Sequence, residues 1–411
     1  MTTSPRAMDG GGAPADGPGG APLTVPATAR LPWPPLLALF TAAFTAVLTE
    51  LLPAGLLPAM SRSLDVPQGR IGLLVTGYAV ASFLAAIPLT AALRALPRRT
   101  VLLAALAVLA VANAVTALSA SYPLTFAARL LAGAAGGTMW AMLAGYGARL
   151  APPRLRGRAI AVVLAGITVA LCAGVPAATA LGSLVGWRAA FAGLTAVAAV
   201  LLLWVRLGVP DLPGTRKADR MPLSRVATTP GVPAVLCVTL FLLLGHQTLY
   251  TYLVPFAAHH GIGAAGPLLF VFGCGTLAGV WTAGLIADRF LRAGLVGALG
   301  AVAGSLAVLG ATGQVPAALV AAVAVWGAAF GAAPTLIQTA LVAVSGPRDA
   351  EVATALQATV YNVGIAGGSS AGALLLERAG PGALPWQAAG LVAVALLVAP
   401  VVGRRLTGPA R

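Results

Sequence analysis

Long apolar segments separated by short polar breaks fill the chain from residue 33 to residue 403. A transmembrane helix needs about 20 predominantly apolar residues, and twelve segments of about that length can be placed in order. They cover residues 33–58, 71–92, 100–119, 123–146, 159–183, 188–207, 232–257, 266–287, 293–312, 316–341, 352–375 and 385–403. The pattern therefore predicts an all-α membrane protein with twelve transmembrane helices.

The longest interior polar segment separates six predicted spans from the following six. Such a six-plus-six arrangement is expected of a transporter built from repeats. The first residues are rich in Gly, Pro and Ala without an apolar run, which is typical of disorder. We predict a disordered cytoplasmic tail over 1–32, an N-terminal six-helix bundle over 33–207, a cytoplasmic linker over 208–231, a C-terminal six-helix bundle over 232–403 and a cytoplasmic tail over 404–411.

Composition supports the membrane assignment, since 59% of the residues are hydrophobic, 9% are charged and the mean hydropathy is +0.93. A soluble protein carries roughly 25% charged residues. The net charge of +15 is distributed unevenly, because 20 of the 25 Lys and Arg residues fall in cytoplasmic segments when the N-terminus is placed inside. This positive-inside pattern predicts cytoplasmic termini and contact with anionic lipid, and it argues against nucleic acid as a partner.

The few reactive residues exclude other classes of protein. Lys217 is the only lysine and follows Arg216, so the chain has no ATP-binding Walker motif. The three cysteines lack metal-ligand spacing, and the only paired histidines, His259 and His260, are adjacent. We therefore expect no metal, no cofactor and no enzymatic activity, and we expect a monomer.

Glu50 is the only one of the ten acidic residues that falls inside a predicted span. Carboxylates at such depth are costly and mark ion or substrate pathways. Pro53 cannot donate a hydrogen bond to the carbonyl of Thr49, so we expect the first span to kink beside Glu50. Counted along their helices, Glu50 lies roughly 12 Å and Arg129 roughly 9 Å from the same membrane surface. We predict that these two residues interact, directly or through water.

Three roles for Glu50 follow from this position: proton coupling, a structural contact that caps the broken helix or Arg129, or binding of a cationic substrate. Proton coupling is favoured because burial and a nearby Arg affect a carboxyl group in opposite directions. A conformational change that alters either effect makes the group take up a proton on one side and release it on the other. For Arg129 the alternative role is to hold the fourth span to the carbonyls of a neighbouring helix.

Further candidates for substrate contact are the large, aromatic or polar side chains within the spans. Met and aromatic surfaces suit varied ligands, and a histidine can titrate near neutrality. For His246, a place in the packed core is the competing interpretation. The predicted substrate-binding residues are Met139, Trp140, His246, Gln247, Tyr250, Tyr252, Trp281, Gln338 and Asn362.

Several motifs stand in the order of one known family. Gly284, Asp288 and Arg289 follow the eighth span, and Arg98 and Arg99 stand at the equivalent place after the second, with Arg94 at the position of the acid. Arg129 is followed four residues later by Gly133, and Gly174 and Pro176 lie in the fifth span. The first span contains Thr49-Glu50 followed by Pro53-Ala54-Gly55-Leu56-Leu57-Pro58. Over residues 33–403 the chain resembles the major facilitator superfamily, and within it the drug:proton antiporter branch with arabinose-efflux-like permeases.

The resemblance implies two pseudo-symmetric six-helix halves around a central cavity lined by the first and fourth spans. It also implies gating roles for Arg98, Arg99, Gly174, Pro176, Gly284, Asp288 and Arg289, since these residues match the inner-loop and antiporter motifs. We expect a secondary transporter in a bacterial cytoplasmic membrane that exports a small molecule such as a drug, metabolite or sugar by proton antiport. The alternatives are a proton-coupled importer, a passive facilitator and, more remotely, a receptor or scaffold that transports nothing.

Overall fold

The computed structural model describes residues 30–93, 95–214, 226–262, 266–312, 315–346 and 349–406, and the described residues form helices without any β-strand. Most of the predicted N-terminal tail, part of the linker, Arg94 and the last five residues lie outside the described residues. The helices are α1 (Trp33–Gly55), α2 (Leu57–Leu64), α3 (Gln68–Leu93), α4 (Arg98–Leu118), α5 (Tyr122–Leu150), η1 (Pro153–Leu155), α6 (Arg156–Val169), η2 (Ala170–Gly174), α7 (Val175–Val185), α8 (Trp187–Gly208), α10 (Val232–Tyr250), α11 (Leu253–His259), α12 (Gly266–Thr312), α13 (Pro316–Ser345), α14 (Ala350–Ala379), η3 (Pro381–Ala383) and α15 (Leu384–Leu406).

Nine helical stretches within the described ranges are long and apolar enough to cross a membrane. Two of them, Gly266–Ala287 and Arg289–Thr312, lie within the range of α12 and are two helices that meet at the non-helical residue Phe290 (φ −131°, ψ 33°). The sequence predicted two spans here, over 266–287 and 293–312. The structure also has two helices here, but a single non-helical residue replaces the short loop that the sequence predicted between them.

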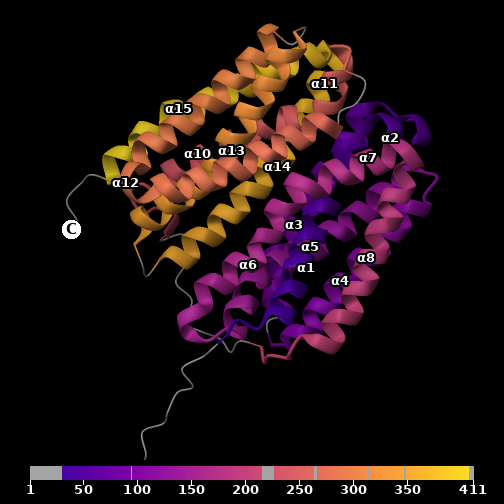
Figure 1. Ribbon diagram of the computed structural model, residues 1–411, viewed down its shortest axis with the longest axis vertical. Coiled ribbons are helices and arrows are strands. Elements are labelled where there is room, and N and C mark those ends of the chain that lie inside the picture. The colour runs from indigo at the N-terminus through magenta and orange to yellow at the C-terminus, as the bar shows by residue number, and fades with distance from the viewer. Residues whose placement is uncertain are drawn as a thin grey trace, which may run out of the picture.

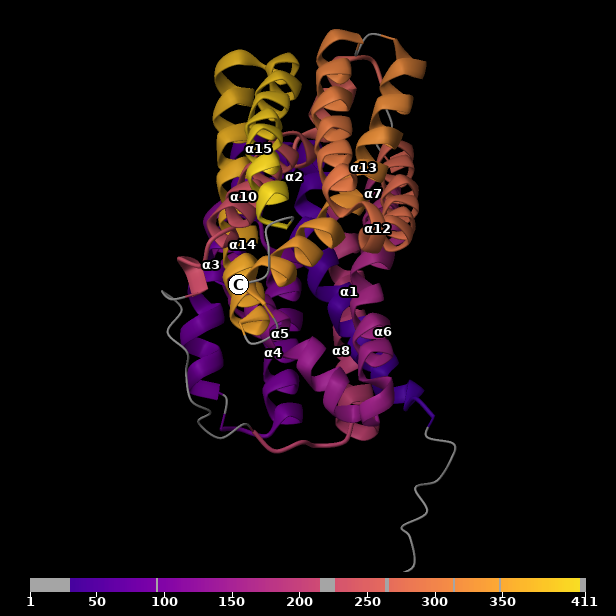
Figure 2. The same cartoon turned by 90° about the vertical axis from the view of Figure 1, so that its left-hand side faces the viewer.

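The helices gather into two groups, coloured indigo to magenta and pink-orange to yellow in Figure 1. In the first group α1 contacts α3, α5, α6, α7 and α8, and in the second α10 contacts α13, α14 and α15. The groups meet where α3 packs against α14 and where η2 and α7 pack against α12, and Figure 2 shows α3 beside α14. Hydrogen bonds join them there, from Ser369 Oγ to the Gly72 carbonyl at 3.0 Å and between the hydroxyls of Thr76 and Ser370 at 3.1 Å.

Glycines at matching places allow the same close packing in both groups. A Cβ on Gly133 of α5 would collide with the carbonyl of Tyr78 on α3, and a Cβ on Gly327 of α13 would collide with the carbonyl of Phe272 on α12. One helical turn further on, Gly137 faces the carbonyl of Ser82, and Gly331 faces that of Thr276. Such small residues allow helix backbones to approach closely in membranes. The two groups are therefore built on one repeated packing plan.

The predicted first span, 33–58, contains α1 and the beginning of α2. We expected a kink beside Glu50; α1 runs through Pro53 to Gly55, and the non-helical residue is Leu56 (φ −114°, ψ 10°). Its amide donates to the Pro53 carbonyl at 3.2 Å. The helix continues past Pro53 because Arg129 of α5 donates to the Thr49 carbonyl, which the proline leaves without a helical donor.

Candidate functional site

Arg129 holds the main chain of α1 at the level of Glu50. Its guanidinium donates from Nη1 to the carbonyl of Thr49 at 2.7 Å and from Nη2 to the carbonyl of Glu50 at 2.9 Å. Its Nε reaches the carbonyl of Leu74 on α3 at 3.4 Å, and the side chain is fully buried. One guanidinium therefore ties three helices together.

The need for this contact follows from Pro53. In an α-helix the carbonyl of residue i accepts from the N–H of residue i+4, so Pro53 leaves the carbonyl of Thr49 without its normal partner. A buried carbonyl without a donor costs about 1–3 kcal/mol. Arg129 supplies the donor, and Asn113 Nδ2 binds the Thr49 hydroxyl at 3.0 Å beside it.

Glu50 is buried at the same level of α1, with only 8% of the residue exposed. Arg129 binds its main-chain carbonyl, and no hydrogen bond to the carboxylate occurs among the described residues. The ring of Tyr78 faces the guanidinium, with 4.9 Å between Arg129 Cζ and the ring centroid. Glu50 and Arg129 thus come together as predicted, but their hydrogen bond runs through the backbone.

A cluster of aromatic rings occupies the second group of helices, and we call it the aromatic cluster. Its members are His246 and Tyr250 of α10, Phe272 of α12, and Trp326 and Phe330 of α13. The rings of His246 and Phe330 are face to face, with centroids 3.5 Å apart and planes 9° apart. Four of the five residues are buried, and Phe330 is half-buried.

Two nitrogen atoms of the aromatic cluster are buried without a hydrogen-bond partner, namely His246 Nδ1 and Trp326 Nε1. Buried polar atoms of this kind are uncommon in native structures and call for an explanation. Sequence reasoning identified His246 and Tyr250 but missed Phe272 and Phe330. A comparison of the two halves could have identified Phe272, because its place in α12 matches that of Tyr78 in α3.

The other predicted contact residues are dispersed. Tyr252 donates to the Ser369 carbonyl at 2.8 Å and packs where the two groups of helices meet. Gln338 binds the Thr354 hydroxyl at 2.7 Å, Asn362 binds the carbonyl of Ala358 in its own helix at 3.0 Å, and Trp281 is 74% exposed. Met139 is buried in the first group, Trp140 is half-buried, and Gln247 is buried with an unpartnered Nε2.

The predicted gating residues lie in two different settings. Gly174 ends a π-helical turn at η2 and faces Phe44 of α1, while Pro176 opens α7. A Cβ on Gly284 would meet open space, Arg289 is exposed, and the side chain of Asp288 lies outside the described residues. Within η2, the thiol of Cys172 donates to the carbonyl of Gly273 on α12 at 2.8 Å. The segment that carries the antiporter-like motif therefore contacts the second group of helices.

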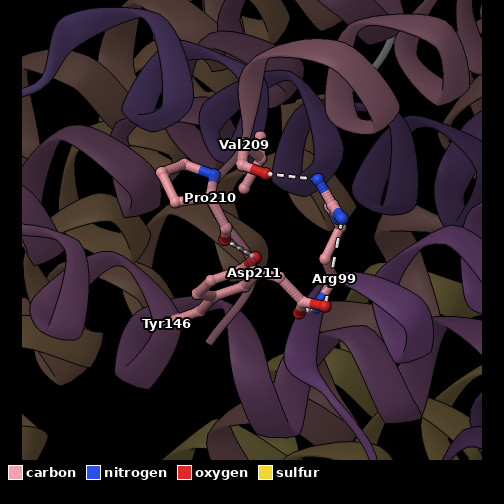
Figure 3. Close-up of polar contacts among 5 residues, drawn as sticks. All are labelled: Arg99, Tyr146, Val209, Pro210 and Asp211. Carbon is pink, nitrogen blue, oxygen red and sulfur yellow. Dashed lines mark hydrogen bonds and ion pairs between the residues drawn. The ribbon is translucent and has the colours of Figure 1, made fainter. Parts of the chain in front are cut away.

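Arg98 and Arg99 bind the segment that follows α8, and Figure 3 shows Arg99 beside Val209 and Asp211. The Arg98 amide donates to the Leu212 carbonyl at 2.8 Å, and the Arg99 amide donates to the Asp211 carboxylate at 3.2 Å. Arg99 Nη2 lies 4.0 Å from the same carboxylate, and the Tyr146 hydroxyl donates to the Pro210 carbonyl at 2.7 Å. Asp211 therefore provides an acidic partner for the inner-loop motif, in which Arg94 occupies the position of the acid.

Removing the Asp211 charge is expected to have a small effect on stability. The two side chains are 30% and 35% exposed, and exposed ion pairs contribute about 0–1 kcal/mol. A double-mutant cycle with Asp211→Asn and Arg99→Gln, read by thermal unfolding in detergent, should give a coupling energy within that range. A coupling above about 2 kcal/mol would contradict this assignment.

Comparisons with known proteins agree with these features. The model of the Major Facilitator Superfamily matches residues 39–369. A chloramphenicol efflux pump of Mycobacterium tuberculosis is 33% identical over 396 residues, which is 92% of this chain and 95% of the pump. A purine ribonucleoside efflux pump of Escherichia coli is 28% identical over 84% of this chain and 88% of the pump. A bacterial homologue of the human lysosomal transporter Spinster, solved in an inward-facing and unoccupied conformation, has a TM-score of 0.70 at 15% identity, over 93% of this chain and all of that one.

Proposed function

The chain belongs to the major facilitator superfamily, and from this we propose that it exports a small molecule across a bacterial cytoplasmic membrane in exchange for protons. It is a multi-pass membrane protein and a transporter rather than an enzyme. The two named relatives are efflux pumps of bacteria, which supports export as the direction. Their substrates, chloramphenicol and purine ribonucleosides, are the first compounds to test.

The proposed topology has twelve membrane helices and both termini in the cytoplasm. Helices α3, α5 and α14 add three candidates to the nine apolar stretches, because they contain 26, 29 and 30 residues and about 20 suffice. The halves would be 33–207 and 232–403, joined by the linker 208–231. The end that carries Arg98, Arg99 and Arg149 would face the cytoplasm, in keeping with the positive-inside rule.

The contacts between the two groups support alternating access. The Thr76–Ser370 and Ser369–Gly72 hydrogen bonds lie in the parts of α3 and α14 remote from the basic end. In the proposed topology these contacts close the outer side, and transport requires them to break while the inner side closes. The glycine-lined packing of α5 on α3 and of α13 on α12 would keep each half rigid during that movement.

The single observation that carries the proton-coupling proposal is the buried carboxylate of Glu50 beside Arg129. Its carboxylate is not fixed by a hydrogen bond among the described residues, although its main chain is held at 2.9 Å. A buried carboxyl group without a fixed partner changes its protonation when its surroundings change. Movement of α1 relative to α5 and α3 would supply that change.

Export is tested by expressing the full chain in a bacterial host that lacks its own efflux pumps. Cells are loaded with chloramphenicol or with radiolabelled inosine, and the retained amount is followed with and without a protonophore. We expect faster loss of at least one compound than in cells with an empty vector, and we expect the protonophore to remove the difference. Export that persists with the protonophore would contradict proton coupling.

A further inference from the structure

The arginines at the basic end of the molecule fall into two sets. Arg99 and Arg149 bind the segment that follows α8, through the Asp211 carboxylate and the Pro213 carbonyl. Four other arginine side chains form neither a hydrogen bond nor an ion pair with a described residue. They are Arg30, Arg154, Arg156 and Arg158. The first set is occupied by the protein itself, whereas the second set is open to a ligand.

A cavity of about 450 Å³ lies where two arginines of the second set meet. Arg30, Leu31 and Trp33 line it from the start of α1. Leu155 and Arg158 line it from the start of α6. Its volume is within the range of roughly 300–1,000 Å³ that small-ligand sites have. The first turns of α1 and α6 contain no acidic residue, so the lining carries two positive charges and no negative charge.

The cavity lies at the level where the chain enters the membrane. Trp33 is the first residue of the apolar stretch Trp33–Gly55, and it is 52% exposed. Tryptophan is enriched at the membrane surface, where its ring lies among the lipid headgroups. The apolar stretch Arg156–Val185 also begins here, and most of it is not buried within the protein. A lipid could therefore place its phosphate in the cavity and its acyl chains along this stretch.

We propose that the cavity binds the phosphate of one anionic phospholipid, of the phosphatidylglycerol or cardiolipin class. Arginine presents a planar fork of donors that matches phosphate oxygens, and basic cavities between membrane helices on the cytoplasmic side suit such headgroups. A zwitterionic phospholipid carries a cationic group beside its phosphate, and Arg30 and Arg158 would repel that group.

The bound lipid would connect the start of α1 to the start of α6. These two helices pack against each other, and α1 carries Glu50. The lipid would therefore fix the inner end of the helix to which we assign proton exchange. This site lies outside the proposed transport pathway, and its occupancy is measured by binding without any transport.

The test is a lipid titration of the purified full-length protein in detergent, with bound lipid counted by native mass spectrometry. The probes are dioleoylphosphatidylglycerol and dioleoylphosphatidylcholine, which have the same acyl chains and differ in headgroup charge. We expect the first phosphatidylglycerol to bind at concentrations roughly tenfold lower than phosphatidylcholine, or lower still. Equal affinity for the two lipids would overturn the proposal.

Variants locate the lipid in the protein. Each arginine near a membrane surface contributes about fivefold to the attraction of anionic lipid. Arg30→Gln with Arg158→Gln should therefore weaken phosphatidylglycerol binding roughly 25-fold and leave phosphatidylcholine unaffected. Arg149→Gln with Arg206→Gln is the matched control, because it removes two exposed charges from the same end outside the cavity. Equal weakening in the two double variants would mean attraction to the whole basic end and would overturn the site.

A soluble phosphate is the competing occupant. Glycerol 1-phosphate carries the phosphate without acyl chains, so it should not displace phosphatidylglycerol at equal concentration. Displacement would assign the cavity to a soluble anion and overturn the lipid proposal. Arg30 and Arg158 are exposed, so the fold should tolerate both substitutions. If the double variant does not elute as a single species, Arg158→Gln alone decides, because about fivefold weaker binding supports the site and unchanged binding overturns it.

Discussion

Arg129→Ala is expected to destabilise the protein by about 1–3 kcal/mol, the cost of one buried polar group left unsatisfied. The substitution removes the donors that lie at 2.7 Å from the Thr49 carbonyl and at 2.9 Å from the Glu50 carbonyl. Only the Thr49 carbonyl is left without a partner, because the Glu50 carbonyl keeps the helical N–H four residues later in α1. Denaturant or thermal unfolding of the purified variant in detergent measures the loss, and transport should fall with it.

The mechanism predicts a specific rescue. Pro53→Ala restores an N–H that can bind the Thr49 carbonyl, so Arg129→Ala should cost less in that background, by about 1–3 kcal/mol. Arg149→Ala is the matched control, because Arg149 is on the same helix and donates to the Pro213 carbonyl at 2.8 Å in an exposed setting. Surface substitutions usually stay within about 0.5 kcal/mol. An equal cost of Arg129→Ala with and without Pro53 would contradict the assignment of Arg129 to the Thr49 carbonyl.

The helical fold could be predicted well because the membrane imposes its own pattern. Backbone groups in lipid must be satisfied within the helix, so apolar length alone located the helical segments. Apolar length does not predict the residue at which a helix breaks, because a break depends on single residues. The break within α12 falls at Phe290, and the break after α1 falls at Leu56, beyond Pro53.

The candidate site was predictable only in part, for a related reason. A buried acid and a buried Arg stand out in an apolar sequence, so Glu50 and Arg129 were identified together. Phe272 and Phe330 did not stand out, because single aromatic residues are ordinary in membrane helices. The repeated backbone packing reveals their place, because Gly133 packs on Tyr78 in the first group and Gly327 packs on Phe272 in the second. This correspondence places the aromatic rings at the level where the first group has Glu50 and Arg129.

Glu50→Gln is expected to abolish uphill export while leaving downhill exchange of the substrate. Gln keeps the size of the side chain and resembles protonated Glu, but it cannot release a proton. At about 100 mV and one pH unit, one proton supplies roughly 2.3 + 1.4 kcal/mol, enough for a substrate gradient on the order of 500-fold. In proteoliposomes with an imposed proton gradient, the wild-type protein should accumulate an exported compound up to that ratio. With Glu50→Gln the accumulation ratio should fall to about 1.

Exchange is the readout that separates coupling from structure. If Glu50 only supported the fold, Glu50→Gln would reduce exchange and uphill transport together and would lower the unfolding temperature. If Glu50 bound the substrate, exchange would be lost in a well-folded protein. Asp65→Asn is the matched control, because Asp65 is an exposed acid at the C-terminal end of α2, and it should leave both activities unchanged. A proton-driven gradient retained in Glu50→Gln would contradict coupling at this residue, because no other acid falls in a predicted span.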